Sequence, residues 1–72
     1  MQEITFSLEG GEYIELCDLL KVTGVAQSGG QGKLFVANGE VTVDSQPESR
    51  KRAKIRPGHV VECLDSRIQV EA

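Results

Sequence analysis

The most chemically distinctive part of the chain is a dense basic segment near residue 50. Residues 49–61 contain five Lys and Arg residues and no acid. Guanidinium groups bind phosphate oxygens through a planar fork of donors, so a row of them suits a polyanion. The alternative is that these charges protect an exposed sheet edge from aggregation. The predominance of Arg favours phosphate contact. The five basic residues lie within the run Arg50-Lys51-Arg52-Ala53-Lys54-Ile55-Arg56.

An extended backbone would sort these side chains onto two faces, because alternate residues of a strand point in opposite directions. Neighbours on one face would stand about 6.6 Å apart along the strand. Four like charges in a row repel one another, so an anionic partner would stabilise them. The expected outer face carries Arg50, Arg52, Lys54 and Arg56, and the other face carries Lys51, Ala53 and Ile55.

A glycine-rich segment, Ser28-Gly29-Gly30-Gln31-Gly32-Lys33, is the second candidate for anion binding. Ser28 and Gln31 have the capping-box spacing, which predicts that a helix begins here. Free backbone N–H groups at such a helix start can bind an anion, with Lys33 one turn further on. The segment is not a P-loop, which requires Gly in place of Gln27 and Ser or Thr in place of Leu34. The alternative is that the glycines only allow close packing against a neighbouring helix.

The other reactive side chains do not form a recognisable catalytic set. His59 is the only histidine, and its position after Pro57-Gly58 predicts a turn residue rather than a phosphate contact. Cys17 and Cys63 lack the paired spacing of metal ligands, and we expect them to be reduced and buried. The sequence therefore predicts no enzymatic activity, no metal site and no cofactor.

Hydrophobic periodicity predicts the elements that position these residues. Apolar residues alternate over residues 4–8, which predicts a strand, and a helical spacing follows from Ile14 to a stop at Gly24. The capping pattern at Ser28 predicts a second helix over residues 29–38.

Short strands and turns are predicted for the rest of the chain. Together with the two helices they describe a compact α+β domain. The expected elements are a strand at 41–43, a turn at 44–47, the extended basic segment at 48–56, a turn at 57–58, a strand at 59–64, a turn at 65–66 and a closing strand through Ile68 and Val70.

Length and charge limit the possible functions. A chain of 72 residues has room for one domain, residues 1–72, and no apolar run is long enough to span a membrane. The formal net charge of -3 hides two opposed poles, because residues 1–18 hold five acids and no base. The N-terminus lacks the features of a signal peptide, so we expect a cytoplasmic protein.

The order and spacing of these segments resemble the alpha-L RNA-binding motif, the S-four-like domain named after a small-subunit ribosomal protein. The likeness runs from about Phe6 to Val70 and is strongest to the small stand-alone bacterial members, the YbcJ-like group. Departures from the wider superfamily are Gly29 in place of Arg, Gly32 in place of Ala, and Asp44-Ser45 in place of Asn-Gly. The segments that carry the resemblance are residues 16–21, Gly24, residues 28–33, residues 39–44, residues 50–55 and Gly58.

The resemblance implies a fold and a function. The fold is a compact alpha-L motif in which two short adjacent helices pack on a small, mainly antiparallel sheet of four to five strands. The function is non-catalytic binding of structured RNA, ribosomal or transfer RNA, mainly through its phosphates, by a monomer without a membrane or small-molecule partner. The expected RNA-binding residues are Lys21, Ser28, Gly29, Gly30, Gln31, Lys33, Arg50, Lys51, Arg52, Lys54 and Arg56.

Scarce aromatic residues favour recognition of RNA shape over the stacking of single-stranded bases. The chain has no Trp, and Tyr13 and Phe35 are predicted to lie in or beside apolar runs. The alternative function is a protein-interaction adaptor, with the basic segment against an acidic partner or the acidic N-terminal region against a basic ribosomal or RNA-processing protein.

Overall fold

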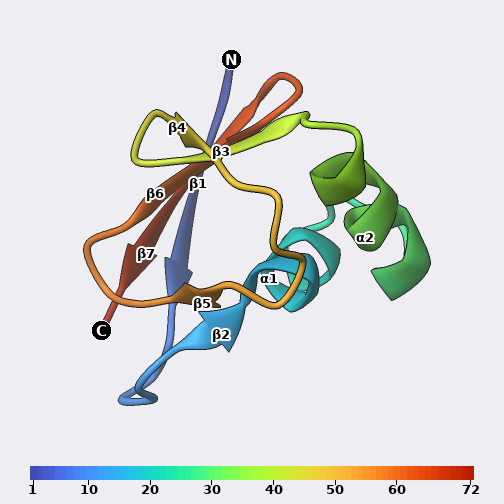
Figure 1. Ribbon diagram of the computed structural model, residues 1–72. Helices are drawn as coiled ribbons and strands as arrows, with labels where there is room; N and C mark the ends of the chain where they lie inside the picture. Colours follow the sequence, from blue (N-terminus) through green and yellow to red (C-terminus); the bar gives the residue numbers. More distant parts are fainter.

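The computed structural model describes residues 1–72 and contains two helices and seven short strands (Figure 1). The helices are α1 (Leu16–Val22) and α2 (Gly29–Ala37). The strands, in chain order, are β1 (Gln2–Ser7), β2 (Ile14–Glu15), β3 (Val41–Val43), β4 (Gln46–Pro47), β5 (Lys54–Ile55), β6 (Val60–Cys63) and β7 (Ser66–Glu71).

Five strands form one mixed sheet with the order β1-β7-β6-β3-β4. The first and last strands run parallel, with Ile4 beside Ile68 and Phe6 beside Val70. All other neighbours in this sheet are antiparallel, which confirms the predicted, mainly antiparallel sheet. Strands β2 and β5 form a separate two-stranded antiparallel ladder that the sequence did not predict.

Helix α1 begins two residues later than predicted. Ile14 and Glu15 are extended because they pair with Ile55 and Lys54 of β5, so their backbone groups are used in the ladder. The predicted stop is confirmed: Gly24 follows the helix with a φ of 82°, a left-handed conformation that glycine adopts without steric cost.

Helix α2 begins where the capping pattern predicted. The Ser28 hydroxyl oxygen accepts a hydrogen bond from the Gln31 N–H at 3.1 Å. The side chain of Gln31 accepts from the Gln27 N–H, one residue before the partner that a capping box would use. Three glycines disfavour this helix, so its packing against α1 must supply part of its stability.

Two turns differ from their predicted positions. Asp44 and Ser45 alone connect β3 to β4, with φ values of 51° and 68°, while Gln46 and Pro47 pair with β3 instead of belonging to the turn. Positive φ at both central residues is the geometry that suits a two-residue hairpin. The turn between β6 and β7 falls at Leu64 and Asp65, one residue earlier than predicted.

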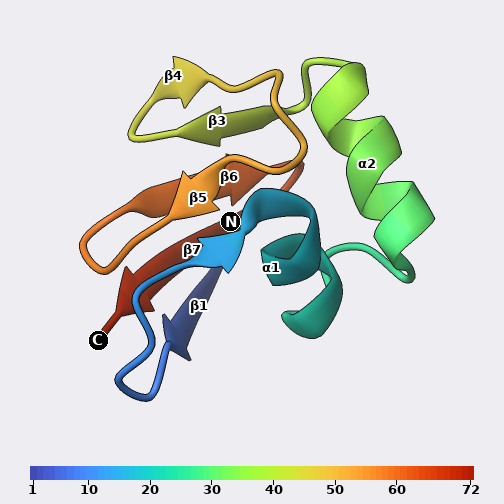
Figure 2. The same cartoon turned by 60° about the horizontal axis from the view of Figure 1, so that its bottom comes forward.

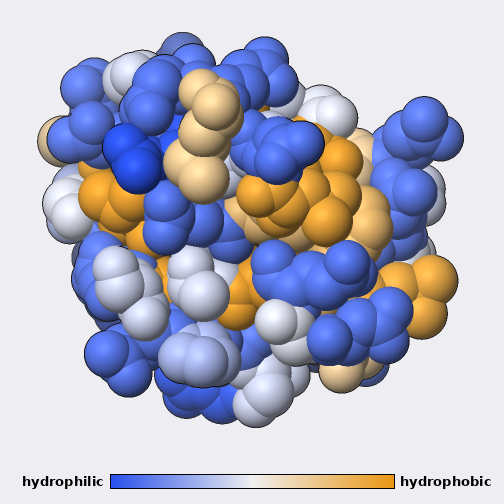
Figure 3. Space-filling view, turned by 90° about the horizontal axis from the view of Figure 1, so that it is seen from above, coloured by the Kyte–Doolittle hydropathy of each residue, from blue (hydrophilic) through white to orange (hydrophobic).

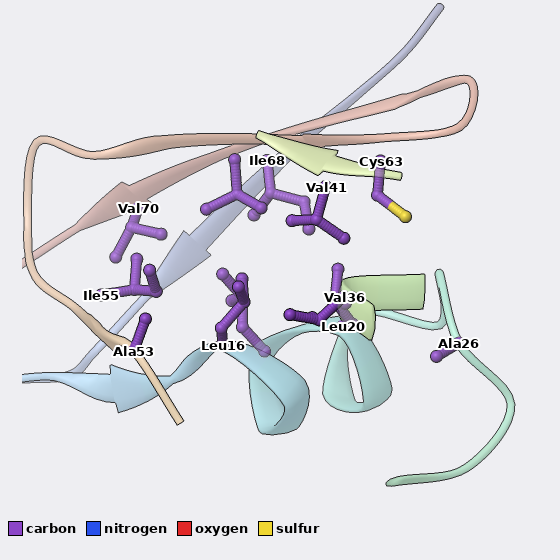
Figure 4. Close-up of a cluster of buried hydrophobic side chains, with 12 residues drawn as sticks. Leu16, Leu20, Ala26, Val36, Val41, Ala53, Ile55, Cys63, Ile68 and Val70 are labelled. Atoms are coloured by element: carbon purple, nitrogen blue, oxygen red, sulfur yellow. The ribbon is translucent and has the colours of Figure 1, made fainter. Parts of the chain in front are cut away.

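The core lies between one face of the sheet and the two helices (Figures 2 and 4). Side chains from α1, α2 and the strands point toward one another there. Cys17 and Cys63 are free and buried, as predicted. The cluster contains Leu16, Leu19, Leu20, Ala26, Val36, Val41, Ala53, Ile55, Val61, Cys63, Ile68 and Val70.

The surface is mostly hydrophilic. Seen from above, blue residues dominate, with an apolar patch toward the side of the helices (Figure 3). Neither helix has the length and apolar character needed to cross a bilayer. The large hydrophobic side chains that are exposed are Met1, Tyr13, Val22, Leu34 and Leu64.

Candidate nucleic-acid interface

The basic segment is a turn followed by a short strand, so the predicted continuous strand over residues 48–56 is wrong. The Ala53 N–H donates to the Arg50 carbonyl at 3.1 Å, which closes a turn over residues 50–53. The carbonyls of Lys51 and Ala53 accept from the N–H groups of Cys17 and Leu16 at 3.0 and 2.9 Å. Helix α1 has no side-chain cap, so this turn satisfies two donors that its first turn would otherwise leave unpaired.

The predicted alternation of side chains survives only after this turn. Ala53 and Ile55 enter the core, whereas Arg52, Lys54 and Arg56 remain exposed. Lys51 was predicted to point away from the other bases, yet it is exposed because the turn interrupts the alternation. An open hollow of about 450 Å³ is lined by Arg50, Arg52, Ala53 and Lys54. Three basic residues therefore line one open hollow.

Two acids lie among these bases. The Glu48 carboxylate accepts from the backbone N–H of Arg50 at 3.0 Å and from its Nε at 3.1 Å. These hydrogen bonds, with the charge of Arg50, lower the pKa of Glu48. Arg52 Nε lies 3.5 Å from Glu15, whose backbone is opposite Lys54 in the β2–β5 ladder. The predicted separation into opposed acidic and basic poles is thus wrong at Glu15.

These ion pairs are exposed and therefore weak. Arg50 and Arg52 have side-chain exposures of 79% and 77%. Exposed pairs of this kind contribute little to stability, because water and salt screen them. Because these ion pairs are weak, a phosphate group can compete with the two carboxylates for the guanidinium groups of Arg50 and Arg52.

Tyr13, which was predicted to lie in or beside an apolar run, has an exposed ring beside the basic strand. Its ring centroid is 5.1 Å from Lys54 Nζ and 5.8 Å from Arg56 Cζ, and the residue is 41% exposed. Exposed cation–π contacts contribute about 0.5 to 1 kcal/mol each. Tyr13 immediately precedes Ile14, and Arg56 immediately follows its partner Ile55, so the two residues flank one end of the ladder. Phe35, by contrast, packs against the core as expected.

The first turn of α2 offers two free backbone donors. The N–H groups of Gly29 and Gly30 donate no hydrogen bond within the protein. The Ser28 hydroxyl, which could accept from this first turn, accepts from the Gln31 N–H instead. A Cβ added at Gly29 would meet no atom within 4 Å, so close packing does not explain this glycine. Gly32 is different: a Cβ there would lie 3.0 Å from the Cys17 carbonyl oxygen. The packing explanation therefore holds for Gly32 alone, and Gly29 and Gly30 face open space or only the Ser28 hydroxyl.

Cys17 joins the two candidate anion-binding segments. Its N–H donates to the carbonyl of Lys51, and its own carbonyl oxygen lies close to Gly32 of α2, 3.0 Å from the place that a Cβ would take there. The basic turn and the first turn of α2 thus both lie against the backbone of one residue, Cys17. Both views show the chain before β5 passing beside α1, with α2 on the same side of the sheet (Figures 1 and 2). Lys21, one helical turn after Cys17, and Lys33 are both exposed beside this junction.

His59 is a turn residue, as predicted. Its Nδ1 accepts from the Arg56 N–H at 3.1 Å, and its Nε2 is 4.0 Å from Asp44. No group of three or more His, Cys, Asp and Glu side chains is arranged to hold a metal ion.

Residues 6–71 match the family described as the S4 domain. The chain belongs to the S4 domain family. This S4 domain is 47% identical to YbcJ of Escherichia coli over 68 residues, which cover 94% of the chain and 97% of YbcJ. The name of YbcJ describes it as a candidate RNA-binding protein.

Two further comparisons agree with this family. The solution structure of Escherichia coli YbcJ superposes on this S4 domain with a TM-score of 0.75, covering 94% of this chain and 86% of that one. That structure is described as revealing an alpha-L motif involved in RNA binding. RlbA of Bacillus subtilis, named for a candidate role in ribosome maturation, is 43% identical over 51 residues, or 71% of this S4 domain and 72% of RlbA. The predicted family and fold are therefore confirmed.

Proposed function

We propose that residues 1–72 form one non-catalytic RNA-binding domain that recognises structured RNA in the cytoplasm, mainly through phosphate contacts. The observation that carries this proposal is the meeting of the basic turn and the first turn of α2 at Cys17. Their juxtaposition combines cationic side chains with free backbone donors. The alpha-L motif of the YbcJ structure supports the same proposal.

The two segments would hold different phosphates of one RNA. Arg50, Arg52 and Lys54 surround a hollow in which a phosphate group meets three cations. The free N–H groups of Gly29 and Gly30 offer a second anion site at the start of α2. Such spaced contacts recognise the shape of a folded backbone, which suits the helical parts of ribosomal or transfer RNA.

The test removes the three charges around the hollow in one variant, R50Q/R52Q/K54Q. Neutral replacements are preferable to Glu, because a new Glu would be repelled by Glu48 or Glu15, which already lie beside these positions. We expect affinity for a fluorescently labelled ribosomal RNA stem-loop, measured by anisotropy, to fall by roughly 100-fold or more. Circular dichroism should stay unchanged because all three side chains are exposed.

The matched control is the single variant R67Q, whose RNA affinity is compared with that of the single variant R50Q. Arg67 also carries an exposed guanidinium, 3.1 Å from Glu3 and 3.2 Å from Glu62, but it lies next to buried Ile68 on the opposite face of β7. We expect R50Q to weaken RNA binding and R67Q to leave it unchanged. Equal effects would indicate attraction by net charge alone, and unchanged binding by the triple variant would contradict the proposal. Binding to an acidic protein but not to RNA would favour the adaptor.

A further inference from the structure

Tyr13 has an exposed ring that the core does not use. It is the only tyrosine, the chain has no tryptophan, and Tyr13 is absent from the cluster of packed hydrophobic side chains. Its neighbour Ile14 does pack against that cluster. Tyr13 therefore directly precedes a residue whose backbone is paired in the β2–β5 ladder, while the Tyr13 residue itself remains 41% exposed.

The surroundings of this ring combine cations with an apolar hollow. Lys54 and Arg56 lie over the ring, two positions apart on the same side of their strand. Tyr13 also lines an open hollow of about 390 Å³. Four of its six lining residues are hydrophobic, and the other two carry a hydroxyl and a carboxylate. The lining residues are Phe6, Ser7, Leu8, Glu9, Tyr13 and Ile14.

This combination matches the chemistry of one unpaired nucleotide. A nucleobase has a flat π-face that stacks on an aromatic ring and polar edges that need hydrogen-bonding groups. The phosphates on either side of it need cations within reach of the same ring. A protein partner would need an apolar side chain with two acidic residues placed beside it, whereas an RNA chain carries a phosphate on both sides of every base.

We propose that Tyr13 is a stacking platform for one unpaired base of the bound RNA, with Lys54 and Arg56 contacting the flanking phosphates. This inference rests on the proposed RNA-binding function and extends it, because phosphate contacts alone do not distinguish a regular duplex from an interrupted one. It assigns this S4 domain a preference for folded RNA that carries a bulged or looped-out nucleotide. The competing explanation is that the two cations merely orient the ring.

The experiment uses two versions of one ribosomal RNA stem-loop, identical except for a single bulged adenosine. We expect Y13A to weaken binding to the bulged stem-loop by roughly 5- to 150-fold and to abolish the preference over the fully paired version. Y13F keeps the ring and should bind like the wild type. The control L64A removes another exposed apolar side chain, which lines a hollow that shares no residue with the Tyr13 hollow.

A second readout needs no substitution. Because Tyr13 is the only tyrosine, its ring-proton NMR signals can be followed in the intact protein. Stacking on a base should move them upfield with the bulged stem-loop and much less with the paired one. Equal affinity of Y13A and wild type for the bulged stem-loop, or unmoved ring signals, would overturn the inference.

The outcomes also separate this inference from the proposed function. If R50Q/R52Q/K54Q loses binding while Y13A does not, the phosphate surface stands and the stacking platform is wrong. If the wild-type protein binds neither stem-loop, or if the triple variant binds as well as the wild type, the proposed function fails and the inference fails with it.

Discussion

Within the surface that we propose binds phosphate, Arg50 and Arg52 each form an ion pair with a carboxylate. Glu48 lies two residues from Arg50 in the chain, so a local contact between them is accessible to sequence reasoning. The contact between Glu15 and Arg52 spans 37 positions and depends on the ladder of β2 with β5. The sequence therefore predicts which basic residues could bind phosphate, but of their two acidic partners it can indicate only Glu48.

The thiol of Cys63 gives a pH-dependent prediction. Burial, with a smaller contribution from the charge of Glu40, raises its pKa from 9.0 to about 11. Between these values the unfolded state binds fewer protons than the folded state, so stability must fall as pH rises. The slope from this one group approaches about 1.4 kcal/mol per pH unit at most. Urea unfolding from pH 8 to 10.5, under reducing conditions, measures it.

The control for this prediction is C63A, which lacks the titrating thiol. We expect C63A to be less stable at pH 8, because it leaves a small cavity, but to lose less stability on going to pH 10.5. Parallel losses in the two proteins would show that other groups, such as lysines, cause the alkaline destabilisation.

At the scale of elements, the glycines of α2 have separate roles. Gly32 allows the backbones of α1 and α2 to approach closely, since a Cβ would lie 3.0 Å from a backbone oxygen of α1. Gly29 and Gly30 keep two N–H groups uncovered at the helix start. The sequence showed the cluster of glycines, but only the packing of the helices distinguishes one role from the other.

This difference predicts opposite effects of G32A and G30A. Alanine at Gly30 meets only the Ser28 hydroxyl at 3.8 Å, so better helix propensity should stabilise the fold by up to about 1 kcal/mol. Alanine at Gly32 must displace α1, which costs roughly 1 to 3 kcal/mol and exceeds that gain. Thermal unfolding of both variants measures the difference. A G32A protein as stable as G30A would show that α1 shifts freely.

At the scale of the whole molecule, net charge is a poor guide to binding. The chain carries -3 overall, yet the surface around Cys17 collects bases from two distant segments. Nearby Glu15 and Glu48 offset part of this positive potential. Their presence should reduce the number of counterions that are released when RNA binds.

The salt dependence of RNA binding tests this offset. Five phosphate contacts from the basic segment would give log affinity against log salt a slope of about -4.5. Glu48 and Glu15 offset part of the charge of Arg50 and Arg52, so we expect a shallower slope of roughly -3. The variant E15Q/E48Q frees two more bases, which should raise affinity and steepen the slope by about 1 to 2. Anisotropy titrations between 50 and about 300 mM salt would measure both slopes.

A matched variant distinguishes local from global electrostatics in that experiment. E3Q/E12Q changes the net charge by the same amount, but Glu3 pairs with Arg67 and Glu12 forms no ion pair. We expect its slope to remain that of the wild type. Equal steepening by the two double variants would mean that total charge, rather than the acids beside the basic turn, sets the counterion release.

The sequence by itself determined the two helices, the stop at Gly24, the Ser28 cap and the location of the bases along the chain, and its resemblance to the alpha-L motif implied the family and the mainly antiparallel sheet. The helix signals depend on neighbours within a few positions, where periodicity and capping act. Tertiary structure alone decided that residues 50–53 form a turn and that Tyr13 is exposed. The turn exists because it accepts hydrogen bonds from Leu16 and Cys17, and Tyr13 is placed by the register of β2 with β5. Both depend on hydrogen bonds between residues more than 30 positions apart, which no local sequence pattern can predict.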